Sequence, residues 1–73
     1  MKIYERDHHY WLMVRLHILQ LGSAWTKGSE GQALMGVALS SDWQQILMDH
    51  APASEHISPR DCAGVVIRNL LLP

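Results

Sequence analysis

The feature that most constrains this sequence is its short length combined with a single cysteine, Cys62, because no disulfide can then form within the chain. A chain of 73 residues buries only roughly 60 % of its unfolded surface. Domains of this size usually gain stability from a disulfide, a structural metal or a second subunit. A lone thiol is typical of a reducing compartment. We therefore expect one small domain over residues 1–73, located in the cytoplasm.

The composition indicates more apolar surface than one small core can cover. Apolar residues make up 48 % of the chain and charged residues 18 %, against a usual charged share of about 25 %. We interpret the surplus as an interface, most simply that of a homodimer. The net charge of −1 provides no overall positive field to attract nucleic acid or anionic lipid.

Residue spacing predicts an all-α fold, a compact bundle of about four short helices. The first helix covers residues 7–21, with Asp7 as N-cap and Gly22 as a left-handed residue that ends it. Apolar residues fall on two faces of this helix, so we expect one face to pack on the core and the other to meet a neighbouring helix of the chain or a partner. The first face has Tyr10, Trp11, Val14, Ile18 and Leu21, and the second has Leu12, Leu16 and Leu19.

The second helix is predicted to begin at Ser29, where Gln32 stands at capping-box spacing, and to run to Leu39. The apolar run over residues 33–39 also fits a short buried strand that would replace this helix. Periodicity does not distinguish the two in so short a run.

Two further helices have clearer start and stop signals. Ser41 and Gln44 form a second capping box, and Pro52 ends the helix that they begin. In the last helix Ser58 is the expected N-cap and Pro59 the first helical residue. Its apolar stripe consists of Cys62, Ala63, Val66, Ile67, Leu70 and Leu71.

The histidines do not have the spacing of a metal site. Zinc motifs place ligands in close pairs such as C-x₂-C or H-x₃-H. The close pair in this sequence is His8 and His9, and adjacent helical residues point about 100° apart. His50 and His56 flank a proline loop and could meet, but we expect no metal and no cofactor.

Catalytic signatures are also missing from the sequence. It contains no glycine-rich phosphate loop, no G-x-S-x-G and no H-E-x-x-H motif. Cys62 lies near a helix N-terminus, which lowers a thiol pKa, but its place on the apolar stripe indicates a buried cysteine that packs as a small hydrophobe. We expect that the protein is not an enzyme.

Duplex DNA is the alternative partner, because short helices joined by turns resemble helix-turn-helix regulators. The last helix would then read DNA with Arg60, Arg68 and Asn69, opposed by Asp61. A reading helix needs a basic face with several polar side chains near its N-terminus, so nucleic acid is not the expected partner. A small transcriptional regulator remains the alternative function.

No membrane partner is expected either. The apolar stretch over residues 10–21 is interrupted by Arg15 and His17, and it is shorter than the ~20 residues of a membrane span.

These observations predict a small cytoplasmic protein-binding module, an adaptor or inhibitor of a larger protein. Its most concrete form is a phage-type inhibitor of a host enzyme or defence complex. Tryptophan is enriched where binding energy concentrates, and Trp25 lies outside the apolar stripes. The residues expected to contact a partner are Leu12, Leu16, Leu19 and Trp25.

Overall fold

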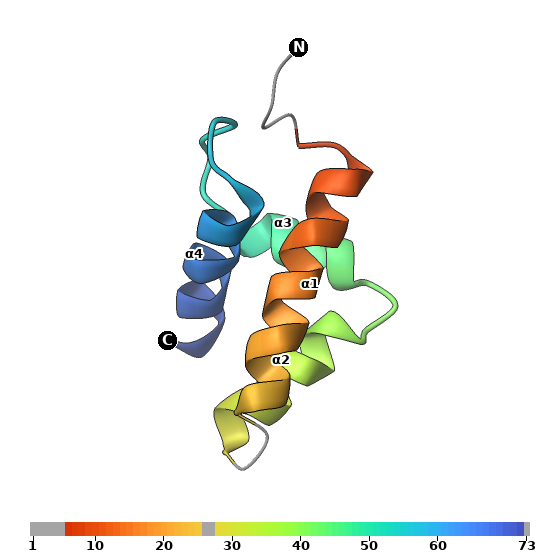
Figure 1. Cartoon of the computed structure of the whole chain (residues 1–73), viewed down its shortest axis with the longest axis vertical. Coiled ribbons are helices and arrows are strands. Elements are labelled where there is room, and N and C mark those ends of the chain that lie inside the picture. The colour runs from red at the N-terminus through yellow and green to blue at the C-terminus, as the bar shows by residue number, and fades with distance from the viewer. Residues whose placement is uncertain (1–5, 26–27, 73) are drawn as a thin grey trace.

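A computed structural model describes residues 6–25 and 28–72, which form a bundle of helices joined by short connections (Figure 1). The helices are α1 (His8–Ala24), α2 (Ser29–Ala38), α3 (Trp43–His50) and α4 (Pro59–Leu71). The described part of the chain contains no strand, and α2 covers most of the apolar run for which a strand was the alternative. The predicted all-α bundle is confirmed, while the homodimer stays a prediction.

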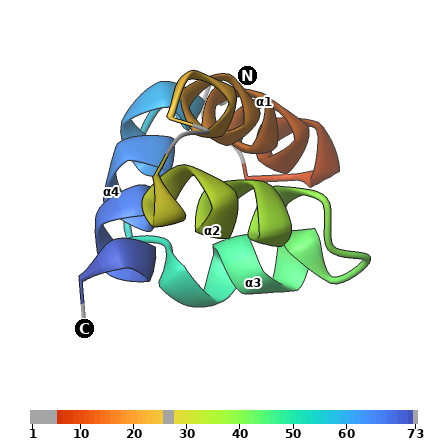
Figure 2. The ribbon, with the colours of Figure 1, turned by 90° about the horizontal axis from the view of Figure 1, so that it is seen from below.

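Helix α1 organises the bundle through its contacts with α2 and α4, which are more extensive than those between any other helices. α1 and α2 run in opposite directions (Figure 1), and α2 lies between α1 and α3 when the bundle is viewed from below (Figure 2). The first apolar face of α1 packs largely into the core, as predicted. Most of the second leucine face stays exposed, so its contact with a partner stays a prediction.

The start of α1 agrees with the prediction, but its end does not. Asp7 is the N-cap, and its Oδ1 accepts a hydrogen bond from the Tyr10 N–H at 2.9 Å. The helix passes through Gly22 and ends at Ala24, with Trp25 as the C-cap. No described glycine has a positive φ, so Gly22 is not a left-handed terminating residue.

Gly22 instead lies buried where α1 and α2 approach each other closely. A Cβ at this position would lie 3.0 Å from the Met35 Sδ and 3.4 Å from the Gly31 carbonyl oxygen. Gly22 therefore serves a contact with α2, a distant segment, and sequence signals for the end of a helix do not reveal such a contact.

Both predicted capping boxes are displaced by one residue. The N-cap of α2 is Gly28, so Ser29 is already helical, and the N-cap of α3 is Asp42 in place of Ser41. Gly28 has no side chain that could cap α2, and the Asp42 side chain makes no capping hydrogen bond to α3. Ahead of α3, the Ser40 hydroxyl accepts the Asp42 N–H at 3.2 Å. Runs of neighbouring polar residues fix a helix start only to within a residue or two.

The predicted end of α3 and the predicted start of α4 are both confirmed. α3 ends at His50, just ahead of Pro52. Ser58 is the N-cap of α4, and its Oγ accepts the Asp61 N–H at 3.1 Å. Pro59 is the first helical residue, where a missing N–H loses no helical hydrogen bond.

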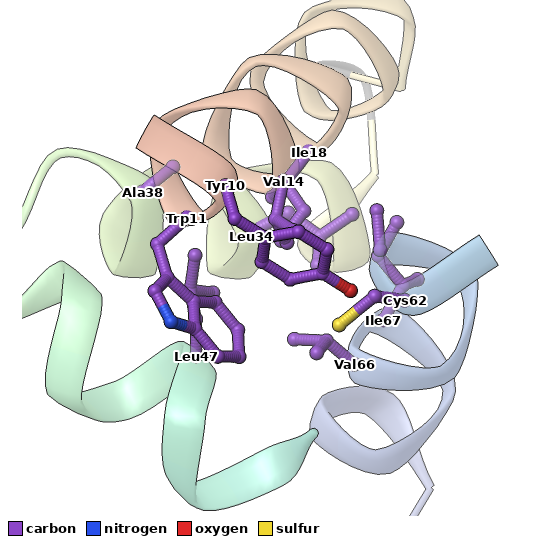
Figure 3. Packing of buried hydrophobic residues seen from close by; sticks show 11 residues of the cluster. Tyr10, Trp11, Val14, Ile18, Leu34, Ala38, Leu47, Cys62, Val66 and Ile67 are labelled. Atoms are coloured by element: carbon purple, nitrogen blue, oxygen red, sulfur yellow. The ribbon is translucent and has the colours of Figure 1, made fainter. Parts of the chain in front are cut away.

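All four helices contribute to one core (Figure 3). The predicted stripe of α4 is confirmed, since Cys62, Ala63, Val66 and Ile67 are buried and the two leucines that follow are partly buried against them. Leu21 is the exception on α1: it is 37 % exposed, and Gly22 occupies the buried position. The remaining core residues are Tyr10, Trp11, Val14, Ile18, Leu34, Ala38 and Leu47.

Among residues 6–25 and 28–72, no helix combines the length and the apolar character that crossing a bilayer requires.

Candidate functional site

The outward side of α1 bears the leucines that the sequence predicts as a contact surface. Leu12 is 38 % exposed and Leu16 is 44 % exposed, one helical turn apart. Leu19 is partly buried and packs against the core. The structure therefore places two of the three leucines together on the surface and gives the third a packing contact within the bundle.

Trp25 lies at the far end of the same helix. Its backbone N–H donates to the carbonyl oxygens of Leu21 at 3.1 Å and Gly22 at 3.2 Å, and its side chain is 43 % exposed. At 1.5 Å per residue it stands about 20 Å along the helix from Leu12. Nine residues also separate it from Leu16, which is about two and a half helical turns, so the structure does not bring Trp25 onto the same side of α1 as the exposed leucines.

Arg15, which lies between the two apolar faces of α1, binds two other helices. Its Nε donates to the Ala38 carbonyl oxygen at 2.8 Å, and its guanidinium lies 4.9 Å from the centre of the Trp43 ring. Ala38 is the last residue of α2, where a positive charge complements the helix dipole. Sequence reasoning missed this role, although a lone cation between two apolar faces was the available signal.

Arg6 is engaged in a similar way. Its Nη1 donates to the Pro52 carbonyl oxygen at 2.7 Å, and its guanidinium lies 5.3 Å from the centre of the Trp11 ring. Arg6 and Arg15 thus tie α1 and its N-terminal approach to the rest of the bundle.

An open groove of about 680 Å³ runs between α1 and α4. His17, Gln20 and Leu21 form its α1 wall. The α4 wall consists of Arg60, Asp61, Ala63, Gly64, Val65 and Arg68. The sequence did not predict this groove, because it forms only where two helices far apart in the chain meet.

The α4 wall presents positive charge on either side of a glycine. Arg60 and Arg68 are exposed and stand about 12 Å apart along the helix, at 1.5 Å per residue. Gly64 lies midway, and a Cβ added there would meet no heavy atom within 4 Å. With Leu21 and Val65 nearby, the groove combines two cations with apolar surface and one carboxylate, Asp61.

Cys62 and Tyr10 form a buried pair in the core, with the hydroxyl and the sulfur facing each other (Figure 3). The Tyr10 hydroxyl donates to the Ile57 carbonyl oxygen at 2.8 Å. Burial raises the pKa of the Cys62 thiol and also that of the Tyr10 hydroxyl. Reactive cysteines have a lowered pKa and some exposure, so this thiol has the environment of a packing residue.

The described histidines are dispersed. Within residues 6–25 and 28–72, no group of three or more histidine, cysteine and acidic residues could hold a metal ion. The His50 Nδ1–H donates to the Ile46 carbonyl oxygen at 2.8 Å, within its own helix. His8 Nδ1 lies 2.6 Å from the Gln44 Oε1, linking the start of α1 to α3.

The surfaces that would face DNA have mixed or negative charge. The Asn69 amide, expected to read bases, donates through Nδ2 to the His50 carbonyl oxygen at 2.8 Å. Asp61 stands next to Arg60, and the exposed side of α3 carries Asp42 and Asp49. Phosphate contacts need clustered cations, and this arrangement does not provide them on α3.

No protein-family model, curated protein or solved structure matches this chain. The class that the fold defines is a small, single-core helical bundle with exposed leucines on its longest helix.

Proposed function

We propose that the protein is a small cytoplasmic binding module, an adaptor or inhibitor that covers a surface on a larger protein. The observation that carries this proposal is the outward side of α1, where Leu12 and Leu16 remain exposed after the core has formed. Complete burial of an exposed leucine side chain contributes roughly 1.5–3 kcal/mol, and the exposed parts of Leu12 and Leu16 would contribute the corresponding fraction. These two side chains stand one helical turn apart on one side of α1, an arrangement that suits an apolar contact with a partner.

Removing the two leucines should weaken binding while the fold survives. In the variant Leu12→Ala/Leu16→Ala we expect at least about a tenfold loss of affinity for the partner, because two apolar contacts are lost. Affinity capture from the native cells, read by mass spectrometry, identifies the partner. Calorimetric titration of that purified partner with the wild-type chain and the variant then measures the effect, and circular dichroism reports on the fold.

A matched control is Leu39→Ala/Leu72→Ala, which removes two leucines that are each 62 % exposed outside α1. This control should bind the partner as the wild type does. Equal affinity of the α1 variant and the wild type would contradict the proposal. So would an α1 variant that unfolds as a monomer, since the leucines would then belong to the core.

A further inference from the structure

We propose that the groove between α1 and α4 binds the acidic side of α3 from a second copy of this chain, so that copies join head to tail. The inference goes beyond the proposed function, because it uses neither Leu12 nor Leu16. It rests on two surfaces of the molecule that complement each other in charge, spacing and apolar character.

The first surface is the groove. Arg60 and Arg68 stand two helical turns apart on its α4 wall, and Leu21 of α1 is 37 % exposed on the opposite wall. Gly64 leaves open space between the two arginines, so a helix can approach α4 closely at this point. Arg6 and Arg15 are bound to backbone carbonyl oxygens elsewhere, whereas Arg60 and Arg68 line the groove.

The second surface is the outward side of α3. Asp42 and Asp49 are both exposed and stand about 10 Å apart along the axis, close to the roughly 12 Å between the two arginines. Gln45 lies between them, and its Nε2 donates to the Asp49 Oδ1 at 2.8 Å, which holds the carboxylate on the helix surface. Met48 is 45 % exposed beside this pair and supplies an apolar side chain for the groove.

An amphipathic acidic helix suits the groove better than a polyanion does. Asp61 opposes any anion in the groove, and the apolar groups Leu21 and Val65 would gain nothing from a phosphate chain. A helix that carries two carboxylates with a methionine beside them satisfies both kinds of group. This is the helix-in-groove mode of recognition.

The pairing cannot form within one copy. Within one copy, α3 packs into the bundle against the other helices, and neither Asp42 nor Asp49 is among the residues that line the groove. Each copy therefore offers one groove and one α3. Such a contact is heterologous, and it produces either a closed ring or an open chain of copies.

Sedimentation velocity of the full chain at low salt, over about a hundredfold range of concentration, tests the proposal. The wild type should form larger species as concentration rises, and added salt should weaken them because the charges are exposed. The variants Arg60→Glu/Arg68→Glu and Asp42→Arg/Asp49→Arg should each associate at least about tenfold more weakly, because like charges then face each other. Mixing the two variants should restore association, since each groove then meets an α3 of opposite charge.

Controls separate this result from changes in fold or net charge. Glu55→Arg alters the charge of an exposed loop and should associate like the wild type, as should Leu12→Ala/Leu16→Ala. If circular dichroism shows that the glutamate variant is unfolded, Arg60→Gln/Arg68→Gln replaces it and should also weaken association.

Two results would overturn the proposal: a wild type that is monomeric at every concentration, or variants whose mixture fails to associate. A monomeric wild type that binds a fluorescent oligonucleotide through Arg60 and Arg68 would assign the groove to a polyanion instead.

Discussion

Two glycines on neighbouring helices have opposite surroundings. Gly22 lies buried against Met35 and the Gly31 carbonyl oxygen, whereas a Cβ at Gly36 would meet no heavy atom within 4 Å. Glycine within a helix costs roughly 1 kcal/mol relative to alanine. Close helix packing offsets that cost at Gly22. At Gly36 no contact offsets it.

Substituting these glycines should therefore change stability in opposite directions. We expect Gly36→Ala to raise the free energy of unfolding by about 0.5–1 kcal/mol, from helix propensity alone. Gly22→Val should lower it by about 1–3 kcal/mol, because the larger side chain separates α1 from α2. Urea unfolding followed by circular dichroism measures both. A stabilising Gly22→Val would show that the close approach of the two helices is not needed.

The buried Tyr10–Cys62 pair makes stability depend on alkaline pH. Burial raises the pKa of the Cys62 thiol above its ordinary 9.0 and that of the Tyr10 hydroxyl above its ordinary 10.0. The folded state then keeps protons that the unfolded state releases. Stability is therefore full below pH 9 and falls as the pH rises above it.

Urea unfolding at a series of pH values from about 7 to 10.5 tests this dependence. We expect a falling free energy of unfolding that begins near the ordinary thiol pKa of 9.0 in the wild type. In Cys62→Ala the decline should begin closer to 10.0, where only the tyrosine contributes. Identical pH profiles for the two proteins would show that the thiol does not titrate with folding.

Among the elements, α3 depends most on its surroundings. It has eight residues, fewer than the roughly 12–15 that an isolated helix needs for stability in water. Leu47 is its one buried residue. Contacts from other helices complete its attachment: His8 reaches Gln44, Arg15 lies over Trp43, and the Asn69 amide reaches the His50 carbonyl oxygen.

Leu47→Ala should consequently destabilise the whole domain by about 2–5 kcal/mol, through lost burial and the cavity that remains. Much of the protein would then be unfolded at room temperature, because small domains have little stability to lose. Thermal unfolding at a concentration where the chain is monomeric measures the loss. Met48→Ala, next to it on the exposed side, should change the midpoint far less, and equal effects would contradict the packing role of Leu47.

At the scale of the whole molecule, the arginines fall into two pairs with different surroundings. Arg6 and Arg15 hold separate segments together through backbone carbonyl oxygens and aromatic rings. Arg60 and Arg68 face an open groove. The two pairs also differ in burial, since Arg6 and Arg15 are partly buried whereas Arg60 and Arg68 are exposed.

The sequence by itself determined the helical class, the caps at Asp7 and Ser58, and the apolar stripe of α4, but it left a strand open over residues 33–39. These features depend on spacing within a few residues, and local hydrogen bonds and helical periodicity are readable at that range.

Only the tertiary structure decided which face of α1 is covered, why Gly22 lies inside the helix, where Arg15 binds and that a groove separates α1 from α4. Each depends on how closely segments far apart in the chain approach one another, as with Gly22 and Met35. Residue spacing within one helix fixes directions around that helix, but the distance to the next helix is set by the packing of both.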